Sequence, residues 1–151
     1  MVKWDGFRRQ KLKKFERSIM RTATIKQKIA FKVDSHEVYE AFMNSKKHAQ
    51  FTGGAARISR KAGGTFSVFD GYATGKNIEL IKDKKIVQTW RASDWEEGHY
   101  STVTIDITPV SSGCSLSFTQ LKVPQSEYED IKRGWNDYYW EPMKKMLEKE
   151  E

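Results

Sequence analysis

Residues 123–147, VPQSEYEDIKRGWNDYYWEPMKKML, hold the pattern that decides the fold. Ser126 and Glu129 match a capping box, a common signal for the start of a helix. We expect residues 126–148 to form one long helix, kinked by Pro142, which removes a backbone hydrogen bond. Aromatic and apolar residues recur every three or four positions, as one face of a helix requires; they are Tyr128, Ile131, Trp135, Tyr138, Tyr139, Met143, Met146 and Leu147.

The part of the chain before this helix has the pattern of strands joined by tight turns. Val103, Ile105 and Ile107 share one side of an extended chain, and the residues between them are mostly threonine. Glycine, aspartate and serine stand between such segments, as they do in turns. Strands joined in this way form an antiparallel sheet with one face exposed to water. We expect strands at residues 22–33, 56–60, 65–69, 72–81, 85–92, 100–108 and 115–123.

A helical period interrupts the strands between residues 34 and 54. Asp34 stands three residues before Glu37, a second capping-box pattern, and apolar residues follow at helical spacing. A short helical or looped piece, KKHAQF, follows and ends at two glycines. This region therefore predicts one helix and a short second piece before the sheet resumes.

Together these elements predict an α+β fold. A sheet of about six or seven strands must bury its apolar face, and the C-terminal helix is long and apolar enough to cover it. We expect a curved antiparallel sheet wrapped around that helix, with Trp135 buried at the contact. The domain is expected to span residues 21–151.

Positive charge is concentrated at the N-terminus. Residues 1–32 carry eleven basic and two acidic residues, a balance of +9, whereas the other 119 carry sixteen basic and eighteen acidic residues, a balance of −2. Because most of the chain is mildly acidic, binding to nucleic acid is not expected. Residues 1–20 are expected to form a basic amphipathic or flexible extension, which either packs on the domain or meets a partner. The candidates for binding an acidic partner are Arg8, Arg9, Lys13 and Lys14.

Length and composition favour one domain inside the cell. A chain of 151 residues buries about 70% of the surface that its unfolded form exposes. No apolar run approaches the roughly 20 residues that cross a bilayer, and no apolar signal region follows the start of the chain. The single cysteine, Cys114, has no partner for an internal disulfide. We therefore expect a cytoplasmic protein.

Little in the sequence predicts catalysis. The three histidines are dispersed, without the spacing of metal ligands, so we expect neither a metal nor a cofactor. Residues 89–101, TWRASDWEEGHYS, allow two interpretations. Glu96, Glu97 and His99 would form an acid–base group in one, and in the other the two tryptophans seal a bend in the sheet. We expect the bend and assign no catalytic residue, because adjacent acids in a turn are usually solvated.

Four short motifs occur in the order that a known family has. They are F-T-G-G at residues 51–54, G-G-x-F at 63–66, W-R-x-x-x-W at 90–95 and G-W-x-x-Y-Y at 134–139. From about residue 22 to residue 147 the chain resembles the C-terminal domain of the activator of Hsp90 ATPase, within the START/Bet v 1-like superfamily. The resemblance implies a helix-grip fold and a non-enzymatic role, since the namesake binds the chaperone Hsp90 and raises its ATPase rate. It also implies a site for apolar ligands, which the wider superfamily often holds between sheet and helix.

Three functions of different classes follow from these observations, and the third is electrostatic binding to a membrane or a nucleic acid through the basic N-terminus. The first is a protein-binding module, an Hsp90-associated co-chaperone homologue. The second is a carrier or sensor of a small apolar ligand in a cavity between the long helix and the sheet. A cavity in the structure would favour the carrier, and a filled aromatic core would favour the binding module. The candidates for lining such a cavity are Phe66, Gln88, Trp90, Phe118, Gln120, Trp135 and Tyr139.

Overall fold

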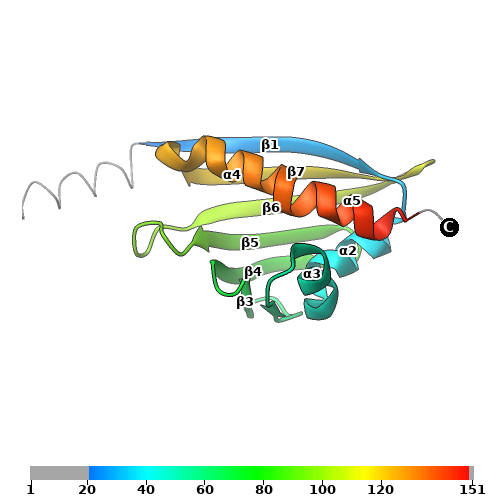
Figure 1. Cartoon of the computed structure of the whole chain (residues 1–151), viewed down its shortest axis with the longest axis horizontal. Helices are drawn as coiled ribbons and strands as arrows, with labels where there is room; N and C mark the ends of the chain where they lie inside the picture. The colour runs from blue at the N-terminus through cyan, green and yellow to red at the C-terminus, as the bar shows by residue number, and fades with distance from the viewer. Residues whose placement is uncertain (1–20, 150–151) are drawn as a thin grey trace, which may run out of the picture.

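Seven antiparallel strands form one curved sheet in the computed structural model, which describes residues 21–149 (Figure 1). The strands are hydrogen-bonded in the order β1-β7-β6-β5-β4-β3-β2, so the first and last strands of the chain are neighbours. The long C-terminal helix crosses one face of this sheet. The strands are β1 (Thr22–Phe31), β2 (Arg57–Ile58), β3 (Thr65–Val68), β4 (Ala73–Ile81), β5 (Lys85–Ala92), β6 (Ser101–Val110) and β7 (Gly113–Pro124).

The predicted helix-grip arrangement and its strands are confirmed. Val103, Ile105 and Ile107 of β6 are buried, and Asp106 between them is exposed, as their alternation predicts. The strand expected at residues 56–60 is shorter, because β2 lies at the sheet edge and pairs over two residues with β3.

Two short helices, α2 (Ser35–Met43) and α3 (Ser45–Thr52), lie between β1 and β2 in the chain. The carboxylate of Asp34 accepts a hydrogen bond from the backbone N–H of Glu37 at 3.2 Å, so Asp34 is the predicted N-cap. Asn44 caps α3 in the same way. These caps fix where each helix begins.

The C-terminal helical segment is continuous but changes its pitch. The capping box predicted at its start is wrong, because Ser126 lies inside a 3-10 turn and no side chain caps the α-helix that follows. The predicted long helix is otherwise present. Its parts are η1 (Gln125–Glu127), α4 (Tyr128–Trp135), the π-helical turn η2 (Asn136–Trp140) and α5 (Glu141–Leu147).

The π-helical turn shows how Pro142 is accommodated. The backbone N–H of Glu141 donates to the carbonyl of Asn136, five residues back. Pro142 then falls in the first turn of α5, where its missing N–H costs little. The irregularity predicted at Pro142 therefore lies before it, as one extra residue in the preceding turn.

The extra residue changes which side chains face the sheet. Tyr139 and Trp140 are consecutive, yet they are 5% and 3% exposed, while Tyr138 is 61% exposed. The expectation that Tyr138 shares the buried aromatic face is therefore wrong. A constant helical period also does not predict the burial of Trp140, because it takes no account of an inserted residue.

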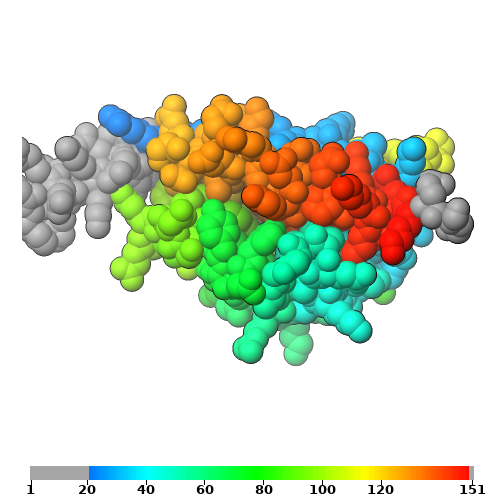
Figure 2. All heavy atoms as spheres, in the orientation of Figure 1, coloured from blue at the N-terminus to red at the C-terminus, as the bar shows by residue number. Residues whose placement is uncertain are grey.

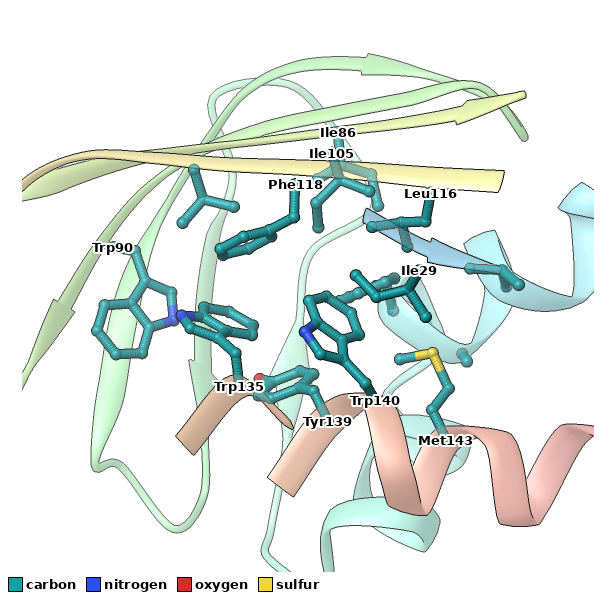
Figure 3. Packing of buried hydrophobic residues seen from close by; sticks show 14 of the residues in the cluster. Ile29, Ile86, Trp90, Ile105, Leu116, Phe118, Trp135, Tyr139, Trp140 and Met143 are labelled. Carbon is teal, nitrogen blue, oxygen red and sulfur yellow. The ribbon is translucent and has the colours of Figure 1, made fainter. Parts of the chain in front are cut away.

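Helix and sheet meet in one aromatic core (Figure 3). Trp135 is 4% exposed, as predicted. Its ring centroid lies 4.5 Å from that of Phe118 on β7 and 4.4 Å from that of Tyr139. In Figure 3, Trp135, Tyr139 and Met143 project from the helix toward the strands.

Residues 93–100 form the bend between β5 and β6. Nη2 of Arg91 donates to the backbone carbonyl of Trp95 at 2.5 Å and to that of Glu96 at 3.1 Å. These two hydrogen bonds stabilise the bend. The rings of Trp90 and Trp95 are buried with their centroids 5.4 Å apart. The bend predicted for residues 89–101 is therefore confirmed.

Candidate functional site

The seven candidate cavity residues come together between the sheet and the C-terminal helix. Six of them are at most 5% exposed, and Gln88 is partly buried. Five of them line a space of about 20 Å³, close to the volume that holds one water molecule; they are Phe66, Gln88, Trp90, Trp135 and Tyr139. Ligand pockets usually measure about 300–1,000 Å³. The space inside the core is therefore small, and Trp90, Trp135 and Tyr139 also line a larger open groove described below; the seven candidates are Phe66, Gln88, Trp90, Phe118, Gln120, Trp135 and Tyr139.

The polar members of this set bond to other groups of the protein. The indole N–H of Trp135 donates to Oε1 of Gln120 at 2.8 Å, and Nε2 of Gln120 donates to Oγ of Ser101 at 2.9 Å. Nε2 of Gln88 donates to Oδ1 of Asn77 at 3.0 Å. These contacts join helix to sheet and strand to strand, so the core polar groups act as structural links.

An open groove of about 510 Å³ lies beside the helix. It is bounded by α4 and η2 on one side and by the turn between β3 and β4 on the other. In Figure 2 the orange helix and the green segment that includes this turn both lie on the face turned toward the viewer. Most of the lining is aromatic; the residues are Thr52, Phe69, Tyr72, Trp90, Asp130, Ile131, Gly134, Trp135, Tyr138 and Tyr139.

Two tyrosines stand at the rim of the groove. Tyr72 is 41% exposed and Tyr138 is 61% exposed, whereas Trp90 and Trp135 beneath them are buried. The ring of Phe69 meets that of Tyr138 edge-on, with centroids 6.2 Å apart. Exposed aromatic side chains over a buried apolar floor are typical of the centres of protein interfaces.

The turn that carries Phe69 is strained and firmly held. Phe69 and Asp70 adopt φ angles of +54° and +56°, which residues other than glycine rarely adopt. The carboxylate of Asp70 accepts the N–H of Ala55 at 2.9 Å, and the carbonyl of Ala55 accepts the N–H of Asp70 at 3.1 Å. Gly54 allows this approach, because a Cβ there would lie 2.9 Å from Cα of Phe69. The glycines after α3 thus support one wall of the groove.

Tyr139, which lines the groove, is hydrogen-bonded to a buried histidine that does not line it. Nε2 of His48 lies 3.0 Å from the hydroxyl of Tyr139, and both residues are buried. Burial lowers the pKa of His48 to about 4 and raises the pKa of Tyr139. Both groups are therefore uncharged at neutral pH, and the floor is apolar in its electrostatics.

Carboxylates surround one end of the groove. Burial raises the pKa of Tyr72, and the nearby carboxylates of Asp94, Glu127 and Asp130 raise it further. Asp130 is also paired with Arg133 at 3.1 Å. This end of the rim is therefore acidic.

Three other expectations from the sequence concern the basic N-terminus, metal binding and membrane spans. Residues 1–20, with the basic candidates, lie outside the described residues, and their role stays a prediction. Within residues 21–149, no His, Cys, Asp and Glu side chains gather in threes to hold a metal ion. No helix of the described part is long and apolar enough to span a membrane. The basic candidates are Arg8, Arg9, Lys13 and Lys14.

Comparison with known proteins identifies the family. The family model described as activator of Hsp90 ATPase homolog 1-like protein matches residues 32–148. The chain belongs to this family. The human activator of 90 kDa heat shock protein ATPase homolog 1 is 31% identical over 126 residues, which are 83% of this chain and 37% of that protein. A Dictyostelium discoideum homologue is 34% identical over 118 residues, 76% of this chain and 30% of its own. The chain thus spans less than two fifths of these relatives.

Solved structures agree with the fold of this family member. The crystal structure of an HSP90 activator from Plasmodium falciparum matches with a TM-score of 0.75 and 28% identity, over 85% of this chain and 96% of that one. The solution structure of the Aha1 dimer from Colwellia psychrerythraea matches with a TM-score of 0.72 and 16% identity, over 83% of this chain and 96% of that one. The second likeness shows the fold alone.

Three of the four motifs of this activator-family chain contribute to the groove or to its support. F-T-G-G forms the support under the strained turn, and W-R-x-x-x-W forms the clamped bend. G-W-x-x-Y-Y supplies Gly134, Trp135 and both tyrosines of the helix wall. Sequence reasoning missed Phe69 and Tyr72, because it treated them as strand ends; two aromatic residues flanking a tight Asp-Gly turn were the available signal.

Proposed function

We propose that this member of the activator family is a non-enzymatic module that binds an Hsp90-type chaperone through the aromatic groove. The main support is the contrast between two volumes: about 20 Å³ between sheet and helix, and about 510 Å³ in the groove open to solvent. The aromatic side chains that a carrier would arrange around a ligand are packed together. Those that remain exposed lie where a partner protein reaches them.

The chemistry of the groove supports a protein partner. Tyr72 and Tyr138 offer large aromatic surfaces with a polar tip, and such residues carry much of the binding energy at interfaces. The held turn at Phe69 keeps one wall in place before the partner arrives, which lowers the entropy cost of association. The relatives named above are Hsp90 ATPase activators, which supports Hsp90 as the partner.

A small apolar ligand is the second candidate. The volume of the groove falls in the range of ligand pockets, and its lining is mostly aromatic. On this hypothesis the ligand lies in the open groove, because the closed interior is filled.

The test is the affinity of the purified chain for purified Hsp90. Replacing Tyr138 with Ala should weaken binding about tenfold or more, as for an interface anchor, and Tyr72→Ala should act in the same direction. Tyr100→Ala is the matched control, because Tyr100 is 45% exposed and does not line the groove. Equal affinity for all four proteins would contradict the proposal. If the parent protein does not bind Hsp90 but binds a fatty-acid probe, and Tyr138→Ala binds that probe more weakly, the result would favour the ligand carrier.

A further inference from the structure

A second pocket, of about 530 Å³, lies where the described chain begins. It is bounded by the bend between β5 and β6 and by the segment that leads into the C-terminal helix. Its lining is more polar than that of the groove. The residues are Arg21, Asp94, Trp95, Glu96, His99, Pro124, Gln125, Ser126 and Glu127.

The charge of this pocket favours a basic occupant. The carboxylates of Asp94 and Glu127 line it together with one arginine, Arg21. Nε2 of His99 is already used, since it donates to a backbone carbonyl of β7 at 2.8 Å. Acidic groups in excess around a concave surface attract a positively charged segment.

Trp95 supplies an independent sign of a missing partner. The residue is 6% exposed and lines the pocket, and its buried indole N–H has no acceptor among the described residues. Buried polar groups are nearly always hydrogen-bonded in folded proteins. A peptide seated in the pocket brings backbone carbonyls that can accept this hydrogen bond.

We propose that the basic residues 1–20 of this chain dock in the acidic pocket. Arg21 forms part of its wall, and residue 20 is bonded directly to it. Lys13 and Lys14 are eight and seven residues before Arg21, a reach of up to about 27 Å. Residues 1–20 carry seven basic and two acidic residues, a balance of +5, which complements the carboxylates.

Docking would connect the N-terminus with the groove. Asp94 and Glu127 of the pocket also lie near Tyr72 at the groove rim, so the two sites adjoin. Docked residues 1–20 would stand beside the surface proposed for Hsp90 and compete with a partner for it. Only this competition rests on the proposed function; docking itself does not require Hsp90.

The test uses the full chain with a nitroxide spin label on Gln10→Cys, an uncharged position. Cys114 is buried and should not react in the folded protein. At low salt, the amide signals of residues 94–99 and 125–127 should lose more than half of their intensity by paramagnetic relaxation. Signals on the outer face of β6 should keep theirs. In 1 M salt, where the Debye length is about 3 Å, the lost intensity should return.

Two double variants decide whether the pocket charges are responsible. Asp94→Asn with Glu127→Gln should restore the signals, while Glu79→Gln with Asp106→Asn, the same charge change outside the pocket, should not. Uniform attenuation of the signals of the whole domain would overturn the proposal. Attenuation that persists in the Asp94→Asn, Glu127→Gln variant would overturn it too. Equal attenuation in unlabelled, ¹⁵N-enriched chains mixed with spin-labelled ones would also overturn it, because the segment would then bind a second molecule.

Discussion

The indole N–H of Trp135 donates to Oε1 of Gln120 across 2.8 Å, and both side chains are buried. The bond joins the middle of the C-terminal helix to β7. The amide of Gln120 continues to Ser101 on β6, and Ser101 donates to the carbonyl of Trp90 on β5 at 2.7 Å. One chain of hydrogen bonds therefore fixes the helix on three neighbouring strands.

Replacing Trp135 should be costly in two separable ways. Trp135→Ala should lower the free energy of unfolding by about 3–5 kcal/mol, as large aromatic truncations in cores do. Trp135→Phe keeps most of the ring but leaves the buried oxygen of Gln120 without a donor, for a loss of roughly 1–3 kcal/mol. Urea denaturation measures both. Tyr138→Ala is the control on the same helix and should cost about 1 kcal/mol or less, because Tyr138 is 61% exposed. A Trp135→Ala variant as stable as this control would contradict the packing described.

His48 should make the protein less stable in acid. Its pKa is about 4 in the folded protein and 6.5 in an unperturbed histidine, so below pH 6.5 the unfolded chain binds a proton that the folded one does not. Its contribution is fully present above pH 6.5 and is lost as the pH falls toward 4, by up to about 1.4 kcal/mol per pH unit. Denaturation at several pH values measures this slope.

Two histidine variants separate this effect from the titration of the carboxylates. His48→Gln should flatten the slope between pH 6.5 and 4. His36→Gln should keep it, because His36 is exposed and meets Asp83 at the surface. The pKa of Glu40 is lowered chiefly by its hydrogen bond to Arg60, which both variants keep. If the two variants show the same slope, burial of His48 does not control the acid response.

Much of the fold follows from sequence because hydrophobic period and turn chemistry are local signals. Alternation in β6 and the cap at Asp34 depend on neighbouring residues, and both are found as expected. The π-helical turn is different. It depends on how Pro142 fits against a preceding turn that is itself packed on the sheet, so a regular helical period misplaced Tyr138 and missed Trp140.

The groove was harder to predict than the core. The seven cavity candidates were chosen for their apolar and amide chemistry, but whether they enclose space depends on side-chain packing, which period and composition do not give. The groove wall at Phe69 arises from contacts between residues 54–55 and 69–70, which are far apart in sequence. Such contacts become visible only once the chain is folded.

Hydroxyl-radical footprinting of the full chain, with and without purified Hsp90, tests the proposed binding surface most directly. Three exposed tyrosines report on it: Tyr72 at 41%, Tyr138 at 61% and Tyr100 at 45% exposure. Binding in the groove predicts that Hsp90 slows the oxidation of Tyr72 and Tyr138 at least severalfold and leaves Tyr100 unchanged. Protection of Tyr100 alone, or no protection of any of the three when Hsp90 is bound, would contradict the account.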